Sequence, residues 1–329
     1  MSDARPRNFL GLDPEDSDPR RAAVLVLPVP YEATVSYGGG TRRGPQAIVD
    51  ASGTVELYDH EHGDEPYRIG VATLEPVPLT VAGPETAMRE LRRAYAKVLD
   101  RRKFVVMLGG EHSVSSPPIR EHAARLRAKG RRLSVLQLDA HGDLRDSWEG
   151  TKFSHACAMR RVVDAADLVQ VGIRAIAREE RAVMRRHGVT TVFAEEMDQG
   201  EAWIDRAIGA LGRDVYLTID IDYFDPSLVP STGTPEPGGG TWYPTMRLLE
   251  RLFRTRHVVA ADVVELAPIP GLVAPDFLAA KLVYKLVGFH ARSRRGAARS
   301  AVRSRAVGGA QCSAAGGRGA GRKGVAPTG

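Results

Sequence analysis

The run Asp139-Ala140-His141-Gly142-Asp143 places three metal-capable side chains at every second position. It follows residues 133–138, a short apolar segment that predicts a buried β-strand. Alternate side chains of an extended segment point to the same side, so Asp139, His141 and Asp143 are expected to converge just beyond the carboxyl end of that strand. Open α/β sheets bind their ligands at this edge. The spacing therefore predicts a metal or ligand site.

Two other predicted strands also end in metal-capable residues. Residues 214–219 lead into Asp220-Ile221-Asp222, and residues 104–108 lead into Gly109-Gly110-Glu111-His112. Taken alone, such a histidine is more often a satisfied polar residue, and such an aspartate caps a nearby N–H. The Asp-x-His-x-Asp run resists that explanation, because burying three such groups without a metal is costly. We expect these metal ligands: His112, Asp139, His141, Asp143, Asp220 and Asp222.

The types of these six side chains narrow the choice of metal. Four carboxylates and two imidazoles without a cysteine disfavour a structural zinc site. A carboxylate-rich set of oxygen and nitrogen donors suits Mn²⁺ and its neighbours Fe²⁺ and Co²⁺. Six ligands are too many for one ion with open positions, and they suit two ions about 3.5–4 Å apart that share carboxylates and a water. Water between two dications loses a proton near neutral pH and becomes a nucleophile.

Strand and helix patterns alternate along the chain, which predicts a mostly parallel sheet with helices on both faces. Apolar runs predict strands at 22–28, 67–73, 103–108, 133–138, 168–173, 189–193, 214–219 and 257–264. Helices are expected at 45–51, 85–100, 116–129, 177–187, 201–211, 246–254 and 275–289. No repeat or linker interrupts residues 21–290. We therefore expect a single three-layer α/β/α domain with a sheet of about eight strands.

The composition is that of a globular protein, with 43% apolar and 26% charged residues. The two cysteines, Cys157 and Cys312, form no disulfide framework, which favours a reducing cytoplasm. The first ten residues lack the apolar region of a signal peptide. No apolar run approaches the ~18 residues needed to span a bilayer.

Both ends of the chain differ in composition from the middle. Residues 1–20 are polar and aperiodic, and are interpreted as an N-terminal arm. Residues 291–329 hold nine Lys and Arg and no Asp or Glu, so they account for the whole net charge of +6. We expect the last helix to end near Phe289-His290 and the tail beyond it to be disordered, because it has too few apolar side chains to offset the entropy of ordering. Its alternative use is to bind polyanions.

Three motifs resemble the metal signatures of the ureohydrolases, the superfamily of arginase, agmatinase and formiminoglutamase. They are Gly109-Gly110-Glu111-His112-Ser113, Asp139-Ala140-His141-Gly142-Asp143 and Asp220-Ile221-Asp222-Tyr223-Phe224-Asp225-Pro226. The resemblance covers about residues 20–290. The agmatinase branch is the most similar, through the run Thr232-Gly233-Thr234-Pro235-Glu236-Pro237-Gly238-Gly239 and through Val264-Glu265-Leu266-Ala267-Pro268.

The resemblance implies an arginase-like fold, two Mn²⁺ ions per chain and a homo-oligomer, either trimer or hexamer. One ion would be held by His112, Asp139, Asp143 and Asp220, and the other by Asp139, His141, Asp220 and Asp222. Glu265 would pair with the substrate guanidinium, Asp143 would help to protonate the leaving amine, and His155 would be a proton shuttle. Without the resemblance, His155 is a loop residue that caps the next helix and Glu265 is a solvated charge.

The expected reaction is hydrolysis of the guanidinium group of agmatine, or of a close relative, to urea and an amine; agmatine gives putrescine. Aminopropylagmatine, a guanidino acid and arginine stay open as alternatives. Residues 144–153 lack the Asn-containing pattern of arginase; Asp146 or Glu149 could attract a distal amine, whereas Arg145 suits a carboxylate. The other class is a catalytically silent binding protein with a tail that contacts nucleic acid. The complete ligand set argues against it, and the tail lacks aromatic residues that stack on bases.

Overall fold

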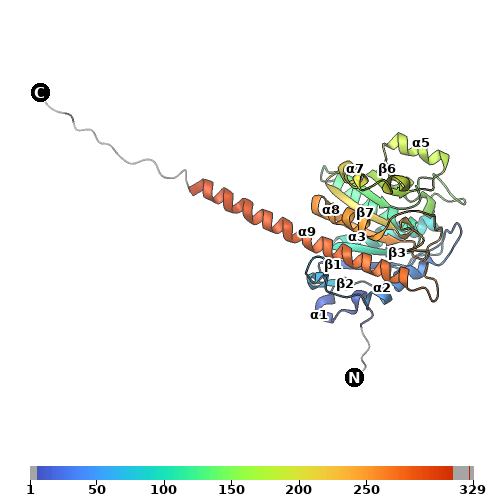
Figure 1. Ribbon diagram of the computed structural model, residues 1–329, viewed down its shortest axis with the longest axis horizontal. Helices are drawn as coiled ribbons and strands as arrows, with labels where there is room; N and C mark the ends of the chain where they lie inside the picture. The colour runs from blue at the N-terminus through green and yellow to red at the C-terminus, as the bar shows by residue number, and fades with distance from the viewer. Residues whose placement is uncertain (1–5, 314–325, 327–329) are drawn as a thin grey trace, which may run out of the picture.

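The computed structural model describes residues 6–313 and 326, and within them all strands belong to one parallel sheet of eight strands (Figure 1). The strand order is β2-β1-β3-β8-β7-β4-β5-β6. Their bounds are β1 Val24–Val29, β2 Val71–Thr73, β3 Phe104–Gly109, β4 Leu133–Leu138, β5 Asp167–Ile173, β6 Thr190–Phe193, β7 Asp214–Asp220 and β8 His257–Val264. The predicted α/β fold with eight strands is confirmed.

Helices cover both faces of the sheet, because the inner strands are apolar on both sides. In β4, Leu136 and Leu138 face one core cluster, whereas Leu133 and Val135 face another. The first face is covered by α2 Gly44–Ser52, α7 Ala202–Ala210, α8 Trp242–Thr255 and α9 Ala274–Ser313. The second face is covered by α3 Pro84–Leu99, α4 Ser116–Arg127 and α5 Arg178–His187. These two helix layers and the sheet form the predicted α/β/α sandwich.

Short helical segments complete the chain. They are η1 Phe9–Gly11, α1 Pro14–Ser17, η2 Thr41–Arg43, η3 Pro66–Ile69, η4 His112–Ser115, η5 His155–Cys157, η6 Met159–Arg161, α6 Ala194–Met197 and η7 Ile221–Tyr223. Two of them change a prediction. The expected strand at 67–73 is η3 followed by β2, separated at Gly70, whose φ of 80° takes the chain out of both conformations. The expected N-terminal arm packs Phe9, Leu10 and Leu12 into the core.

The prediction that the last helix ends near Phe289-His290 is wrong, since α9 continues to Ser313. Ala291 is buried, and Arg292 and Arg295 reach Asp64 at 3.1 and 3.2 Å. Alanine and arginine, which are frequent here, also favour helix. The C-terminal part of α9 extends away from the sheet (Figure 1). The expectation of disorder for 314–325 and 327–329 lies outside the described residues. Within the described range, no helix is long and apolar enough to cross a membrane.

Candidate active site

The site lies at the carboxyl edge of four adjacent strands, β3, β8, β7 and β4, which run parallel and therefore end together. A cavity of about 510 Å³ opens there. The predicted site residues that line it are His112, His141, Asp143, His155, Asp220, Asp222 and Glu265. The remaining predicted ligand, Asp139, is fully buried and lies 3.0 Å from His112, which lines the cavity. The fold thus brings all the predicted site residues together.

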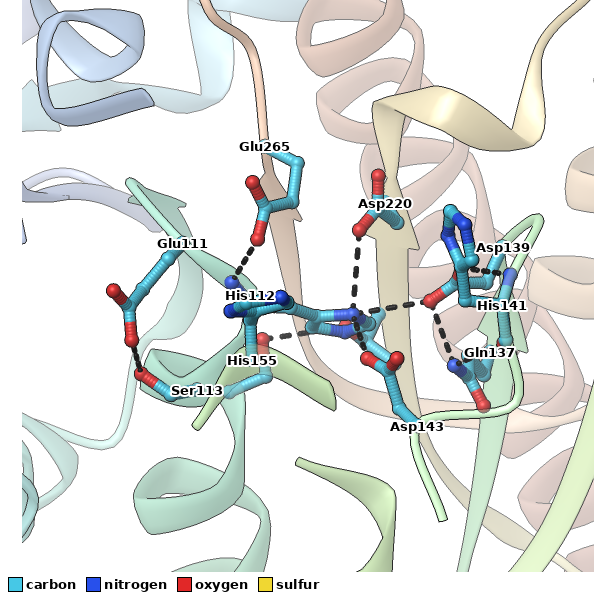
Figure 2. Close-up of polar contacts among 12 residues, drawn as sticks. Glu111, His112, Ser113, Gln137, Asp139, His141, Asp143, His155, Asp220 and Glu265 are labelled. Carbon is cyan, nitrogen blue, oxygen red and sulfur yellow. Dashed lines mark hydrogen bonds and ion pairs between the residues drawn. The ribbon is translucent and has the colours of Figure 1, made fainter. Parts of the chain in front are cut away.

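Two groups of potential metal ligands share Asp139: His112 with Asp139 and Asp220, and His141 with Asp139 and Asp222. In the first, Nδ1 of His112 lies 3.0 Å from Asp139 Oδ2 and 3.4 Å from Asp220 Oδ2 (Figure 2). Asp143 Oδ2 is 2.9 Å from the same nitrogen. In the second, Nδ1 of His141 lies 2.8 Å from Asp222 Oδ2. One carboxylate thus joins two adjacent candidate sites.

The electrostatics of this region fit divalent cations. Burial, and then the Asp139 carboxylate, raises the pKa of Asp143 to about 7. Burial raises the pKa of Asp220 well above its usual range, and the negative charge of Asp222 raises it further. Among the described side chains, the four aspartates pair with His112 and His141 and with no Lys or Arg. Buried charges need a counter-charge, and metal ions would supply it.

Hydrogen bonds from neighbouring groups hold the carboxylates in place. Gln137 Nε2 donates to Asp139 Oδ2 at 2.7 Å, and the backbone N–H of Ala140 donates to Asp222 Oδ1 at 3.0 Å. The N–H of Asp222 donates to Asp220 Oδ1 at 2.9 Å. Each bond occupies one position on a carboxylate that has several acceptor positions. The oxygens are therefore oriented before any ion binds.

Two of the site residues have a left-handed backbone, which is uncommon outside glycine. The φ angles are 54° at Asp143 and 65° at Glu265. Such strain costs about 1–3 kcal/mol and persists where the surroundings hold it, often at functional sites. Glu265 donates its N–H to the Gly110 carbonyl at 2.8 Å, and its Oε1 accepts from the His112 N–H at 2.6 Å (Figure 2). This turn directs the Glu265 carboxylate into the cavity from the end of β8.

His155 is the first residue of η5, and each of its ring nitrogens contacts a hydroxyl group. Its Nδ1 lies 2.9 Å from Thr34 Oγ1, and its Nε2 lies 2.8 Å from Ser36 Oγ. Thr34 donates its hydroxyl proton to Glu111 Oε1, so its oxygen accepts from His155 Nδ1–H. Burial, and then the charge of His141, lowers the pKa of His155 to about 4. The imidazole is therefore neutral near pH 7, with Nε2 toward Ser36.

Three polar residues of the site were missed from the sequence. Thr34 and Glu111 position His155, and Glu236 lines the cavity. Their contacts join segments far apart in the chain, which periodicity does not reveal. The only signal in the sequence was that Glu111 and Glu236 lie within the motifs that resemble the ureohydrolases. The two acids predicted to attract a distal amine, Asp146 and Glu149, do not line the cavity.

The charged side chains that line the cavity differ in how many partners they have within the protein. Arg145 donates to Glu179 at 3.1 Å and stacks 4.5 Å above the Trp148 ring. The guanidinium of Arg174 is used on backbone carbonyls, those of Gly172, Asp222, Tyr223, Phe224 and Glu236. The side chain of Glu236 is 40% exposed, and its only ion pair among the described residues is with His141 Nε2 at 4.0 Å. The charge left available to a ligand at the mouth is therefore negative.

Comparison with known proteins gives consistent matches. The model of the arginase family matches residues 22–288. The N(1)-aminopropylagmatine ureohydrolase of Synechocystis sp. is 41% identical over 281 residues, which cover 83% of this chain and 91% of that protein. The agmatinase of Pyrococcus horikoshii is 33% identical, covering 84% and 94%. The structure of proclavaminate amidino hydrolase from Streptomyces clavuligerus superposes with a TM-score of 0.79 at 28% identity, covering 88% and 98%.

Proposed function

Since this chain belongs to the arginase family and is a ureohydrolase, we propose that its substrate is a guanidinoalkyl compound with a distal amine. N(1)-aminopropylagmatine is the first candidate and agmatine the second. The N(1)-aminopropylagmatine ureohydrolases of Synechocystis sp. and Thermus thermophilus are 40–41% identical to this chain and that of Thermococcus kodakarensis is 32% identical, whereas the agmatinase of P. horikoshii is 33% identical. Hydrolysis would yield urea and a polyamine.

The observation that carries this proposal is the charge at the cavity mouth. Among the described residues, the Glu236 carboxylate has a single ion pair, with His141 at 4.0 Å, whereas Arg145 and Arg174 are bonded to other groups. A protonated amine gains a charge-assisted contact with such a carboxylate. The α-carboxylate of arginine would instead lie near the Glu236 carboxylate, where Arg145 and Arg174 are already bonded to other groups. The mouth therefore favours an amine over an amino acid.

The metal centre in this proposal follows the two ligand groups. His112, Asp139, Asp143 and Asp220 would hold one ion, and Asp139, His141, Asp220 and Asp222 the other. The donors are carboxylate oxygens and imidazole nitrogens, a set that suits Mn²⁺. When bound, the two ions would activate water as a nucleophile near neutral pH and offset negative charge that develops on oxygen.

The protein groups orient the substrate above this centre. The carboxylate of Glu265 faces the cavity, and its Oε1 is held by the His112 N–H at 2.6 Å, which leaves the other oxygen for the guanidinium. A planar cation with parallel N–H donors is matched by a carboxylate. The amine end would extend toward Glu236 at the mouth. Two acids that line the cavity, Glu265 and the 40% exposed Glu236, would thus set the direction of the bound substrate.

Proton transfer completes the reaction. Water adds its oxygen to the guanidino carbon, the bond from that carbon to the alkyl nitrogen breaks, and the amine leaves with an added proton. Asp143, which lines the cavity 2.9 Å from His112, would take a proton from that water and pass it to the leaving nitrogen. His155, which is neutral because burial lowers its pKa to about 4, would exchange protons with the surroundings through Ser36.

The test is urea release from N(1)-aminopropylagmatine, agmatine, arginine and a guanidino acid in the presence of Mn²⁺. The expected order of kcat/KM follows that sequence, with each amine substrate at least about 10-fold above arginine, or about 1.4 kcal/mol. A preference for arginine by the same margin would contradict the substrate and leave the hydrolysis intact. Metal-stripped protein that still releases urea would contradict the metal centre.

A further inference from the structure

Behind His112, on the side away from the cavity, a row of polar groups is buried in the sheet. Nε2 of His112 lies 3.0 Å from Thr218 Oγ1. Thr218 donates to Asp262 Oδ1 at 2.6 Å, and the hydroxyl of Tyr216 donates to Asp262 Oδ2 at 2.8 Å. Asp262 is fully buried and lies outside the candidate metal-ligand groups. Among the described residues, the side chains of Thr218, Tyr216 and Asp262 therefore contact the proposed metal centre through His112 alone.

Strand geometry explains why these groups meet. Alternate residues of β7 face the same side, so Tyr216, Thr218 and Asp220 share one face. In the parallel register between β7 and β8, Thr218 is paired with Asp262. The same face of β7 thus carries a potential metal ligand at its end and, two residues earlier, a hydroxyl that reaches His112. A position inside the central strands makes this arrangement rigid.

The direction of the hydrogen bonds follows from their chemistry. A threonine hydroxyl has one proton to donate. Thr218 Oγ1 lies 2.6 Å from Asp262 Oδ1 and 3.4 Å from Ser115 Oγ, so the proton goes to Asp262. Both oxygens of Asp262 face hydroxyl donors, so the carboxylate accepts from both. The oxygen of Thr218 must then accept a proton from His112 Nε2. A neutral imidazole with its proton on Nε2 has a bare Nδ1, the atom that faces Asp139, Asp143 and Asp220.

The charge of Asp262 points to the same conclusion. No Lys or Arg in the described part of the chain pairs with this carboxylate, although an isolated buried charge is costly. The path from Asp262 through Thr218 and His112 ends where a cation would bind. Neighbouring groups that hold a histidine ligand in one tautomer commonly tune metal affinity.

We propose that Asp262, acting through Thr218, is a positioning residue that keeps the proton of His112 on Nε2 and so presents Nδ1 to one metal ion. This inference rests on the proposed two-ion centre. It concerns one ion only, because among the described residues the side chain of Thr218 contacts His112, Ser115 and Asp262 and not His141, Asp139 or Asp222. Loss of the hydroxyl should therefore weaken one ion and spare the other.

The experiment is a titration of metal-stripped protein with Mn²⁺, with bound metal read by equilibrium dialysis. Thr218→Val keeps the shape of the side chain and removes the hydroxyl. It should weaken one of the two ions by about 10–100-fold and leave the other within about 3-fold of wild type. Thr218→Ser retains the hydroxyl and should restore binding. Asp262→Asn should resemble Thr218→Val, because its amide can donate to Thr218 and turn the hydroxyl proton toward His112.

Tyr284→Phe is the control. Tyr284 is also buried, and its hydroxyl donates to the Leu57 carbonyl rather than to any group of this network, so this variant should bind both ions as wild type does. Thermal unfolding of each metal-free variant checks that it is folded. Wild-type affinity for both ions in Thr218→Val, or equal loss in the Ser and Val variants, would overturn this inference alone. A wild-type chain that binds fewer than two ions would overturn the proposed centre as well.

Discussion

Two regions of the described chain combine carboxylates with histidine at distances that suit a metal ion: the buried cavity at the sheet edge, and the cluster of Asp59, Glu61 and His62, in which only Asp59 is buried. In the second, Lys285 Nζ lies 2.8 Å from Asp59 and 2.9 Å from Glu61. In the first, the described residues provide no Lys or Arg partner for the aspartates. The residue types are alike, and the difference is whether the chain supplies its own cations.

This difference assigns the regions different roles. The Asp59 cluster is neutralised by Lys285 on α9, so it attaches the last helix to the loop at 59–64. The four aspartates of the cavity pair with only two histidines among the described residues, so imported cations would balance the remaining negative charge. A set of metal-capable residues therefore indicates a metal site only when Lys and Arg side chains do not already neutralise it.

The largest expected effect is on the ligand shared by both groups in the cavity. Asp139→Asn should lose most bound metal and lower kcat/KM by about 10³-fold or more, which is about 4 kcal/mol. Metal analysis and urea release measure both. Glu61→Gln is the matched control from the other cluster, where Lys285 already occupies the site, and it should keep both metal and turnover. Ordinary turnover with two ions in Asp139→Asn would refute the shared ligand.

The converse prediction concerns the cation of the second cluster. Lys285→Met should lower the free energy of unfolding by about 3–5 kcal/mol, because it leaves Asp59 buried without its main partner. Bound metal and kcat per folded molecule should not change. Chemical denaturation measures the first and metal analysis the second. An unchanged unfolding free energy together with gain of a metal ion at Asp59 would reverse the roles of the two regions.

Glu265→Gln separates substrate binding from metal binding within the cavity. The amide keeps the shape of the side chain but removes the charge that faces the guanidinium, which should cost about 2–4 kcal/mol in kcat/KM. Metal content should stay at the wild-type value, since Glu265 belongs to neither ligand group. If the variant instead loses metal, Glu265 supports the ligands rather than the substrate.

The smallest expected effect is at the mouth. Glu236→Gln should raise KM for N(1)-aminopropylagmatine by about 10-fold, equivalent to about 1.4 kcal/mol, and leave kcat nearly unchanged. N-butylguanidine, which has no distal amine, is the control substrate and should show no change. A similar rise in KM for both compounds, or loss of metal, would mean that Glu236 acts on His141, its neighbour at 4.0 Å.

Sequence patterns predicted much of this fold because the responsible forces are local. The bounds of β4 and β8 follow from apolar runs, and parallel strands bring His112, Asp139 and Asp220 to one edge. The left-handed φ of Asp143 carries no such pattern. The contact between Arg292 and Asp64, 228 residues apart, is equally invisible, and the predicted end of α9 was wrong for that reason.

The number of metal ions that the sheet edge binds is the most direct test of the proposed metal centre. Metal-stripped wild-type protein and the Glu61→Gln and Asp139→Asn variants would each be dialysed against Mn²⁺ and analysed for bound metal. We predict two ions per chain in wild type and in Glu61→Gln, and loss of most of the metal in Asp139→Asn. Fewer than two ions in wild type, or metal lost with Glu61 and kept without Asp139, would contradict the assignment of the metal centre.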